Sequence, residues 1–204
     1  MAIRGVGTIF GDKQSGEVDS IGADLYLELL YNQLEKIEKL RLNPLKPQEV
    51  KTPDFAEIPS LGTEYVATED ARKIANDSLA GARSNAEVDK VLSSLVACFG
   101  DADPTSLMAV NYHRLRTLAG ELGVTRIKMD EEAGVVDFEV DAEEEVKEML
   151  VDNLDEMYRK DLTVTEQGIR VVALAGASRD VTLAQAVNAL RRITDSLPSF
   201  IKFL

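Results

Sequence analysis

Four of the six prolines of this 204-residue chain fall between positions 44 and 59, and this cluster divides the chain. Proline fixes φ, lacks the backbone N–H and pushes the residue before it out of the helical region. No helix can therefore run through the cluster, although residues 48–58 could include an edge strand. We predict three parts: residues 1–42, a proline-rich linker over 43–60 and a domain over 61–204.

The first part begins with a glycine-rich segment and then changes to a helical pattern. Four glycines lie between positions 5 and 16, which indicates tight turns or a close approach of the backbone. From Ile21 to Leu42 apolar residues recur every three or four positions, as on one face of an amphipathic helix. We therefore predict a glycine-rich loop or short helical hairpin over residues 3–20, followed by one long helix.

The third part mixes helical and strand-like patterns. Apolar periodicity predicts five helices, at 68–79, 84–99, 104–122, about 141–154 and 180–195. The expected N-terminal caps are Thr68, Ser84, Asp103, Asp141 with Glu144, and either Asp180 or Thr182. Alternating residues predict two hairpins, 124–129 with 135–140 and 162–166 with 168–175. This order predicts an α+β fold in which several helices pack on a small, mainly antiparallel sheet.

Nearly all of the net charge lies in one segment. Residues 130–167 carry 15 acidic and three basic side chains, which gives −12 of the chain's −13. Such a surface repels phosphates and should not bind nucleic acid. A solvated face that keeps the domain soluble is the simplest explanation. The alternative is a docking surface for a basic partner, formed by glutamates at the start of one predicted helix: Glu143, Glu144, Glu145 and Glu148.

No residue pattern indicates an active site. The chain has no P-loop, and its N-terminal glycines do not follow a strand of a βαβ unit. The single His113 has no companion ligands and is expected to be a surface or partly buried residue. Cys98, beside Phe99, is expected to be a packed thiol. We predict no catalytic residue, no metal and no cofactor in this chain.

The sequence also shows neither a membrane-spanning segment nor a targeting peptide. No apolar run approaches the roughly 18 residues that span a bilayer, so we expect no membrane partner. The first residues do not have the pattern of a secretory signal or a transit peptide.

Residues 3–26 resemble the translocation motif of transcription-repair coupling factors. The matching residues are Ile3-Arg4-Gly5-Val6-Gly7, Gly11-Asp12, Gln14-Ser15-Gly16, Gly22 and Asp24-Leu25-Tyr26. A related motif occurs in bacterial fork-reversal translocases. The amino-acid sequence of residues 4–11 resembles that of plant and algal chloroplast members of the coupling-factor family. Later landmarks follow the order of the family's C-terminal domain: Glu64-Tyr65-Val66, Phe99-Gly100 and Leu122-Gly123-Val124-Thr125-Arg126-Ile127.

The resemblance implies that the motif couples nucleotide hydrolysis by a motor to movement on duplex DNA. The residues that it assigns to this coupling are Arg4, Gly5, Gly7, Gly11, Gln14, Ser15 and Gly16. Glycines allow sharp turns, Arg4 can bind a carboxylate or phosphate through two hydrogen bonds, and Gln14 can bridge two backbone groups. Without the resemblance, a glycine-rich structural turn with Arg4 on the surface would explain the same residues.

The resemblance also implies a regulatory, non-catalytic role for residues 61–204. ATP and magnesium would bind the motor of a longer parent protein, not this chain. The implied partners are the parent's motor and N-terminal domains, RNA polymerase and duplex DNA through the parent, and a repair protein, with the chloroplast as location. The alternative is a stand-alone protein-binding adaptor domain that has lost the motor. Helicase motifs encoded upstream of Ile3 would favour the first interpretation.

Overall fold

The structure is a computed structural model that describes residues 50–51 and 58–197. The chain divides into two units, Met1–Leu42 and Asn43–Leu204, and all described residues belong to the second. The predicted glycine-rich segment, the long helix and most of the linker therefore lie outside the described residues. The boundaries proposed for the three parts stay a prediction.

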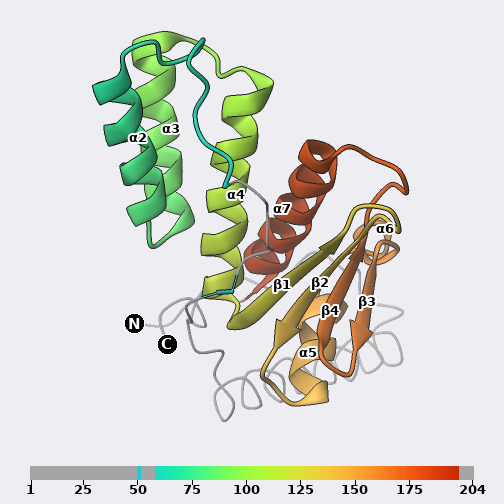
Figure 1. The fold of residues 1–204 in the computed structure, drawn as a ribbon. Helices are drawn as coiled ribbons and strands as arrows, with labels where there is room; N and C mark the ends of the chain where they lie inside the picture. Colours follow the sequence, from blue (N-terminus) through green and yellow to red (C-terminus); the bar gives the residue numbers. More distant parts are fainter. Residues whose placement is uncertain (1–49, 52–57, 198–204) are drawn as a thin grey trace, which may run out of the picture. The chain divides into compact units, whose positions relative to one another are not determined.

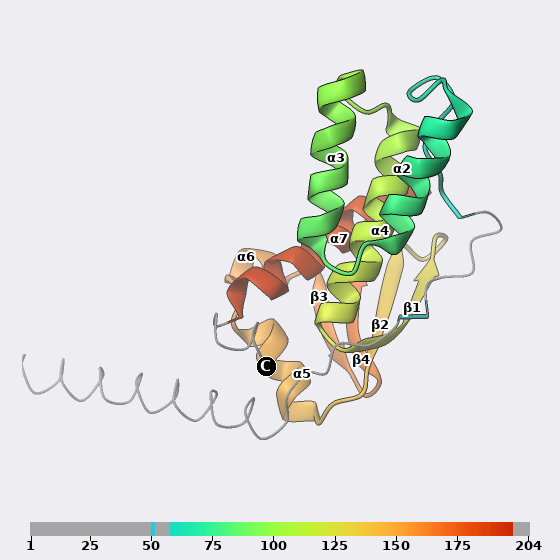
Figure 2. The ribbon, with the colours of Figure 1, turned by 90° about the vertical axis from the view of Figure 1, so that its left-hand side faces the viewer.

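Three helices form one layer of the described unit (Figures 1 and 2). They are α2 (Glu69–Gly81), α3 (Asn85–Phe99) and α4 (Pro104–Glu121). Asp103 begins α4 because its carboxylate accepts the Ser106 N–H at 2.9 Å, and Ser84 caps α3 by accepting the Glu87 N–H at 3.3 Å. A first apolar core lies between the three helices, and its buried members include Leu61, Val66, Leu79, Val88, Leu95, Ala109 and Val110.

The second layer is a four-stranded sheet with the order β1-β2-β4-β3. Its strands are β1 (Val124–Asp130), β2 (Val135–Val140), β3 (Leu162–Thr165) and β4 (Gly168–Val172). All three strand pairs are antiparallel. Both predicted hairpins form, and β4 pairs with β2, so the second hairpin joins the first through its later strand.

One face of this sheet is buried and the other is charged. Alternate residues of β2 and β4 point into a second apolar core: Val136, Phe138, Val140, Ile169 and Val171. Helices α4, α5 (Glu144–Asp152) and α7 (Arg179–Ser196) pack against this side. The opposite face carries ion pairs between strands, such as Asp137 with Arg170 at 2.6 Å. The period-2 alternation in the sequence is the direct cause of this one-sided burial.

Helix α4 belongs to both cores. Its first half contributes Ala109 and Val110 to the core of the helical layer, and its second half contributes Leu115, Leu118 and Ala119 to the core on the sheet. Burial of each such leucine is worth about 1.5–3 kcal/mol. The two layers therefore share one continuous element, and α4 also packs along α7.

The α+β class, the five predicted helices and the four predicted strands are confirmed, with ends that differ by a few residues. The sequence did not predict α6 (Glu156–Arg159), because four residues are too few to show a helical period. Most of the edge strand expected within 48–58 lies outside the described residues, among which Lys51 forms an isolated bridge, parallel to Arg126, so this expectation stays a prediction.

Two predicted caps were also wrong. The N-cap of α5 is Glu143 and not Asp141, and the N-cap of α7 is Ser178 and not Asp180 or Thr182. A hydrogen bond with Ser178 lowers the pKa of Asp180, so this carboxylate lies within the first turn of α7 instead of preceding it. The error arose because Ser178 is separated from the first buried residue of the helix by three residues.

Candidate docking sites

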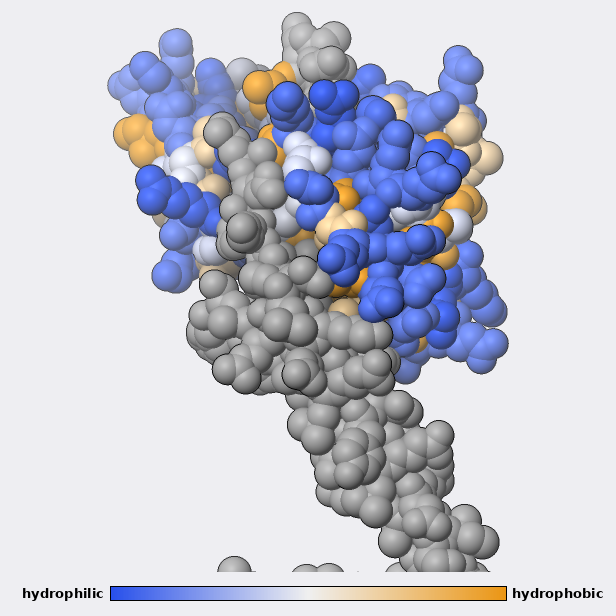
Figure 3. All heavy atoms as spheres, turned by 90° about the horizontal axis from the view of Figure 1, so that it is seen from below, coloured by the Kyte–Doolittle hydropathy of each residue, from blue (hydrophilic) through white to orange (hydrophobic). Residues whose placement is uncertain are grey.

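The four glutamates proposed as a docking surface are brought together at the start of α5. Glu143 is the N-cap, Glu144 and Glu145 form the first turn and Glu148 lies one turn later; all four are exposed. Carboxylates at this position complement the positive end of the helix dipole. Their placement at a helix N-terminus is confirmed, whereas a docking role stays a prediction. From the end at which α5 lies, the described surface is mostly hydrophilic (Figure 3).

The opposite side of α5 explains why these glutamates face outward. Val146, Met149 and Leu150 are buried, and so is Lys147, the only basic residue of the helix. The Lys147 ammonium donates a hydrogen bond to the Glu166 carbonyl oxygen at 2.6 Å, which ties α5 to the β3–β4 hairpin. Helix α5 therefore presents acidic but no basic side chains to solvent.

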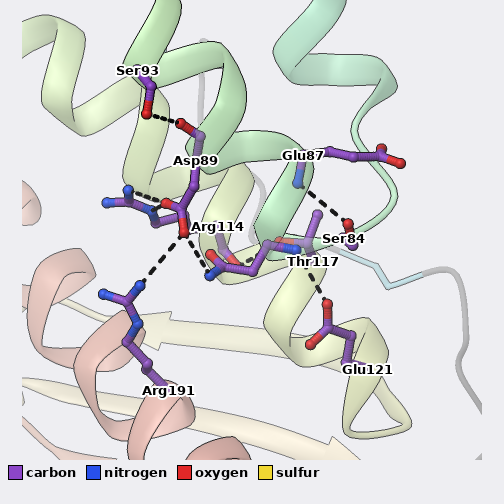
Figure 4. A network of polar contacts seen from close by, with 9 residues as sticks. Ser84, Glu87, Asp89, Ser93, Arg114, Thr117, Glu121 and Arg191 are labelled. Atoms are coloured by element: carbon purple, nitrogen blue, oxygen red, sulfur yellow. Dashed lines mark hydrogen bonds and ion pairs between the residues drawn. The ribbon is translucent and has the colours of Figure 1, made fainter. Parts of the chain in front are cut away.

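A polar network joins α3, α4 and α7 around Asp89 (Figure 4). Arg114 donates to Asp89 Oδ1 through Nη2 at 2.5 Å and through Nε at 3.2 Å. Asn85 Nδ2 donates to Oδ2 at 3.3 Å, and Arg191 of α7 lies 3.6 Å from the same oxygen. The network was missed from the sequence because its members are up to about a hundred residues apart and carry no local signal.

His113 and Cys98 differ from expectation. His113 is buried, not at the surface, and its Nδ1 has no hydrogen-bond partner. Burial, with a smaller effect of the Arg116 charge, lowers the pKa of His113 to about 4, so the imidazole is neutral. Cys98 is exposed, so the prediction of a packed thiol was wrong. The last turn of α3 extends past the core that covers its earlier turns.

A cavity of about 350 Å³ lies between α6, the β3–β4 pair and α7. Its walls combine apolar residues with Asp161, Asn188 and Arg192, and the Arg192 guanidinium stacks on the Tyr158 ring at 3.4 Å. Within residues 50–51 and 58–197 no group of three or more His, Cys, Asp or Glu side chains could hold a metal ion. No helix among these residues is long and apolar enough to cross a membrane. The absence of cofactors stays a prediction.

The residues assigned to the translocation motif lie outside the described residues: Arg4, Gly5, Gly7, Gly11, Gln14, Ser15 and Gly16. Their proposed role therefore stays a prediction.

Residues 58–149 match the model of the TRCF domain family. The match covers less than half of the chain, and this segment is therefore similar to the TRCF domain family. The match runs from the approach to α2 into α5, whereas the sheet of the described unit is completed further along the chain by β4, which pairs with β2. The structural unit is thus longer than the segment that carries the family's sequence signature.

Relatives match over still longer spans. The chain is 28% identical, over its full length, to an Arabidopsis thaliana protein named as a chloroplastic ATP-dependent DNA helicase, of which it covers 25%. It is 28% identical over 68% of its length to the transcription-repair-coupling factor of Escherichia coli, of which it covers 12%. The crystal structure of a C-terminal domain of transcription-repair coupling factor aligns with a TM-score of 0.46 at 8% identity, over 73% of this chain and 97% of that one. The chain thus spans a quarter or less of these two full-length relatives.

Proposed function

We propose that this chain is the C-terminal regulatory segment of an ATP-dependent double-stranded DNA translocase that acts on stalled RNA polymerase in transcription-coupled repair. The observation that carries the proposal is the match of residues 58–149 to the TRCF domain family, preceded in the same chain by residues 3–26, which resemble the translocation motif. In this proposal residues 1–42 transmit motor movement, and residues 61–204 restrain the motor without catalysing a reaction. ATP and magnesium bind the motor of the parent protein.

The match to a chloroplastic relative, which covers the whole of this chain and a quarter of the relative, supports a chloroplast location. It also supports a parent protein with further domains, because the relatives are several times longer than this chain. The partners in this proposal are the parent's own motor and N-terminal domains, with RNA polymerase, duplex DNA and a repair protein reached through the parent.

The exposed glutamates of α5 support the proposal that residues 61–204 restrain the motor. Glu144, Glu145 and Glu148 give this end of the TRCF domain a negative field that favours a basic surface and disfavours nucleic acid. Contacts of this kind set orientation and association rate more than affinity. A regulatory contact that must be released requires fast, correctly oriented association without high affinity.

The proposal that residues 1–42 transmit motor movement is tested in the full-length parent with Arg4→Ala and Gln14→Ala. We expect each variant to retain ATP hydrolysis and to lose most of the movement on DNA, measured by displacement of a triplex-forming strand. Lys13→Ala, which removes a basic side chain from between the motif residues, is the matched control and should move normally. Normal strand displacement by both motif variants would refute the coupling role.

The proposal that α5 helps to restrain the motor is tested by removing three charges from this helix in the same parent. Glu144→Gln, Glu145→Gln and Glu148→Gln together should raise the ATPase rate in the absence of DNA, because the docked state is weakened. The control variant carries Asp77→Asn, Glu132→Gln and Asp195→Asn, which remove the same charge from exposed positions elsewhere. Equal ATPase rates in the two triple variants would show that α5 has no special part in restraint.

A further inference from the structure

The last turn of α3 exposes four consecutive apolar residues, Val96 to Phe99. Val96 is 38% exposed and Phe99 is 46% exposed. Val88, Leu92, Leu95 and Phe99 lie on one stripe of α3, and its earlier members pack in the core of the helical layer. The stripe therefore continues one turn beyond the core. An exposed run of this length is unfavourable for a domain that meets only water, and it indicates a binding surface.

Tyr65 completes this surface from the segment before α2. Its ring meets the Phe99 ring edge to face, with centroids 6.0 Å apart, and its hydroxyl donates to the Gly100 carbonyl at 2.8 Å. This hydrogen bond and ring contact hold Phe99 in place while half of its side chain stays exposed. We call the surface of Tyr65 and residues 96–99 the Phe99 patch. A rigid aromatic pair of this kind suits the anchor position of an interface.

The surroundings of the patch are acidic. Residues 58–71 and 91–113, which meet at this end of the helical layer (Figure 1), contain five acidic residues and no lysine or arginine. The acidic residues are Glu64, Glu69, Asp70, Asp101 and Asp103. Burial raises the pKa of the Tyr65 hydroxyl, and the charges of Asp101 and Asp103 raise it further, which places both carboxylates close to the ring.

Two further observations keep this end negative. Arg72 and Lys73 are the nearest basic residues along α2, and Arg72 is engaged within the fold because it donates to the Val66 carbonyl at 2.7 Å. The last turn of α3 has no basic residue, so the negative end of its dipole is not compensated from within the helix.

We propose that the Phe99 patch binds a short segment of another protein that carries one or two apolar anchors flanked by arginine or lysine. The patch spans about one helical turn, roughly 5 Å along α3, which suits a short peptide and not the broad face of a folded domain. A second copy of this chain is disfavoured, because contact through this patch would bring two acidic rims together in a chain of net charge −13. The inference does not depend on the coupling role of residues 3–26 or on the glutamates of α5.

The test uses the whole 204-residue chain, labelled with ¹⁵N, and two synthetic helical peptides of equal length and leucine content. One peptide carries arginine at every polar position and the other carries glutamate. We expect the arginine peptide to shift the amide signals of Tyr65 and residues 94–101, and the glutamate peptide to shift none of them. Phe99→Ser should weaken arginine-peptide binding at least tenfold. Leu174→Ser, which removes a residue of similar apolar surface that is 66% exposed at the end of the sheet, is the matched control.

Charge reversal provides a second variant that leaves the aromatic pair intact. Asp101→Lys should weaken arginine-peptide binding and strengthen glutamate-peptide binding without changing the far-UV circular dichroism. Three results would each overturn the proposal: shifts that map to residues 143–148 instead, equal binding of the two peptides, or equal effects of Phe99→Ser and Leu174→Ser. A dimer of the free chain that Phe99→Ser dissociates, seen by sedimentation, would also overturn it in favour of self-association.

Discussion

Lowering the pH from 7 to 5 should destabilise the described unit through His113, the only histidine of the chain. The side chain is buried on α4, and its Nδ1 has no hydrogen-bond partner. Burial, and then the positive charge of Arg116, lower its pKa from 6.5 to about 4. The folded state therefore keeps the imidazole neutral, whereas the unfolded chain takes up a proton near the ordinary pKa.

The sign and size of the effect follow from this difference. Because the folded pKa is the lower one, the contribution of His113 is complete above about pH 6.5 and is lost as the pH falls toward 4. The whole gap is worth about 3 kcal/mol at about 1.4 kcal/mol per pKa unit. Between pH 7 and pH 5 the loss in unfolding free energy should be about 2 kcal/mol.

Urea unfolding of the whole chain at both pH values measures this loss, with His113→Phe and His113→Gln as variants that cannot titrate. Carboxylates contribute equally to all three proteins, so the wild type should lose about 2 kcal/mol more than either variant. An NMR titration of the imidazole should give a pKa of about 4. The same pH dependence in wild type and variants, or an imidazole pKa near 6.5, would refute the reasoning.

Three substitutions test the packing by the same urea assay. Gly168→Ala should cost about 3 kcal/mol or more, because a Cβ there would overlap the backbone of β2, whereas Gly81→Ala, with no atom near its Cβ position, should be neutral. Asp89→Ala should cost about 1–2 kcal/mol and Arg191→Ala less than about 0.5 kcal/mol, because Arg191 is the half-exposed and more distant partner; equal costs would contradict this. Arg116→Ala should cost about 1–2 kcal/mol, because its guanidinium donates to three carbonyls at the end of α2; an unchanged midpoint would contradict this.

The elements of the described unit were predictable because each carries its own periodicity. Apolar stripes fixed the long helices, and alternation with glycine at the turns fixed both hairpins. Local chemistry also fixed the caps at Ser84 and Asp103, where the capping side chain lies three residues before its donor. Short elements such as α6 carry too few residues for a period to appear.

The features that decide exposure were not predictable in the same way. Cys98 and Phe99 occupy helical positions that look buried, yet the core that would cover them ends one turn earlier. His113 is polar, yet α4 buries it because this helix lies between two cores. Both errors depend on where neighbouring elements stop, which only the packing of elements distant in sequence determines. The acidic residues of α5 were predictable because they project from a helix with one clear apolar side.

Helix α4 constrains how the two proposed binding surfaces can communicate. The Phe99 patch lies at one end of the described unit and α5 at the other, and both views show them apart (Figures 1 and 2). Helix α4 is the main mechanical link between them, and its two halves are fixed in separate close-packed cores. Asp89 adds a polar tie between α3 and α7 across that helix. A domain held in this way should respond to a ligand at one surface with little movement at the other. In the proposed regulatory role, the outcome depends on which partner occupies each surface, and Asp89→Ala, which loosens the tie, is the variant in which coupling between the two surfaces should change first.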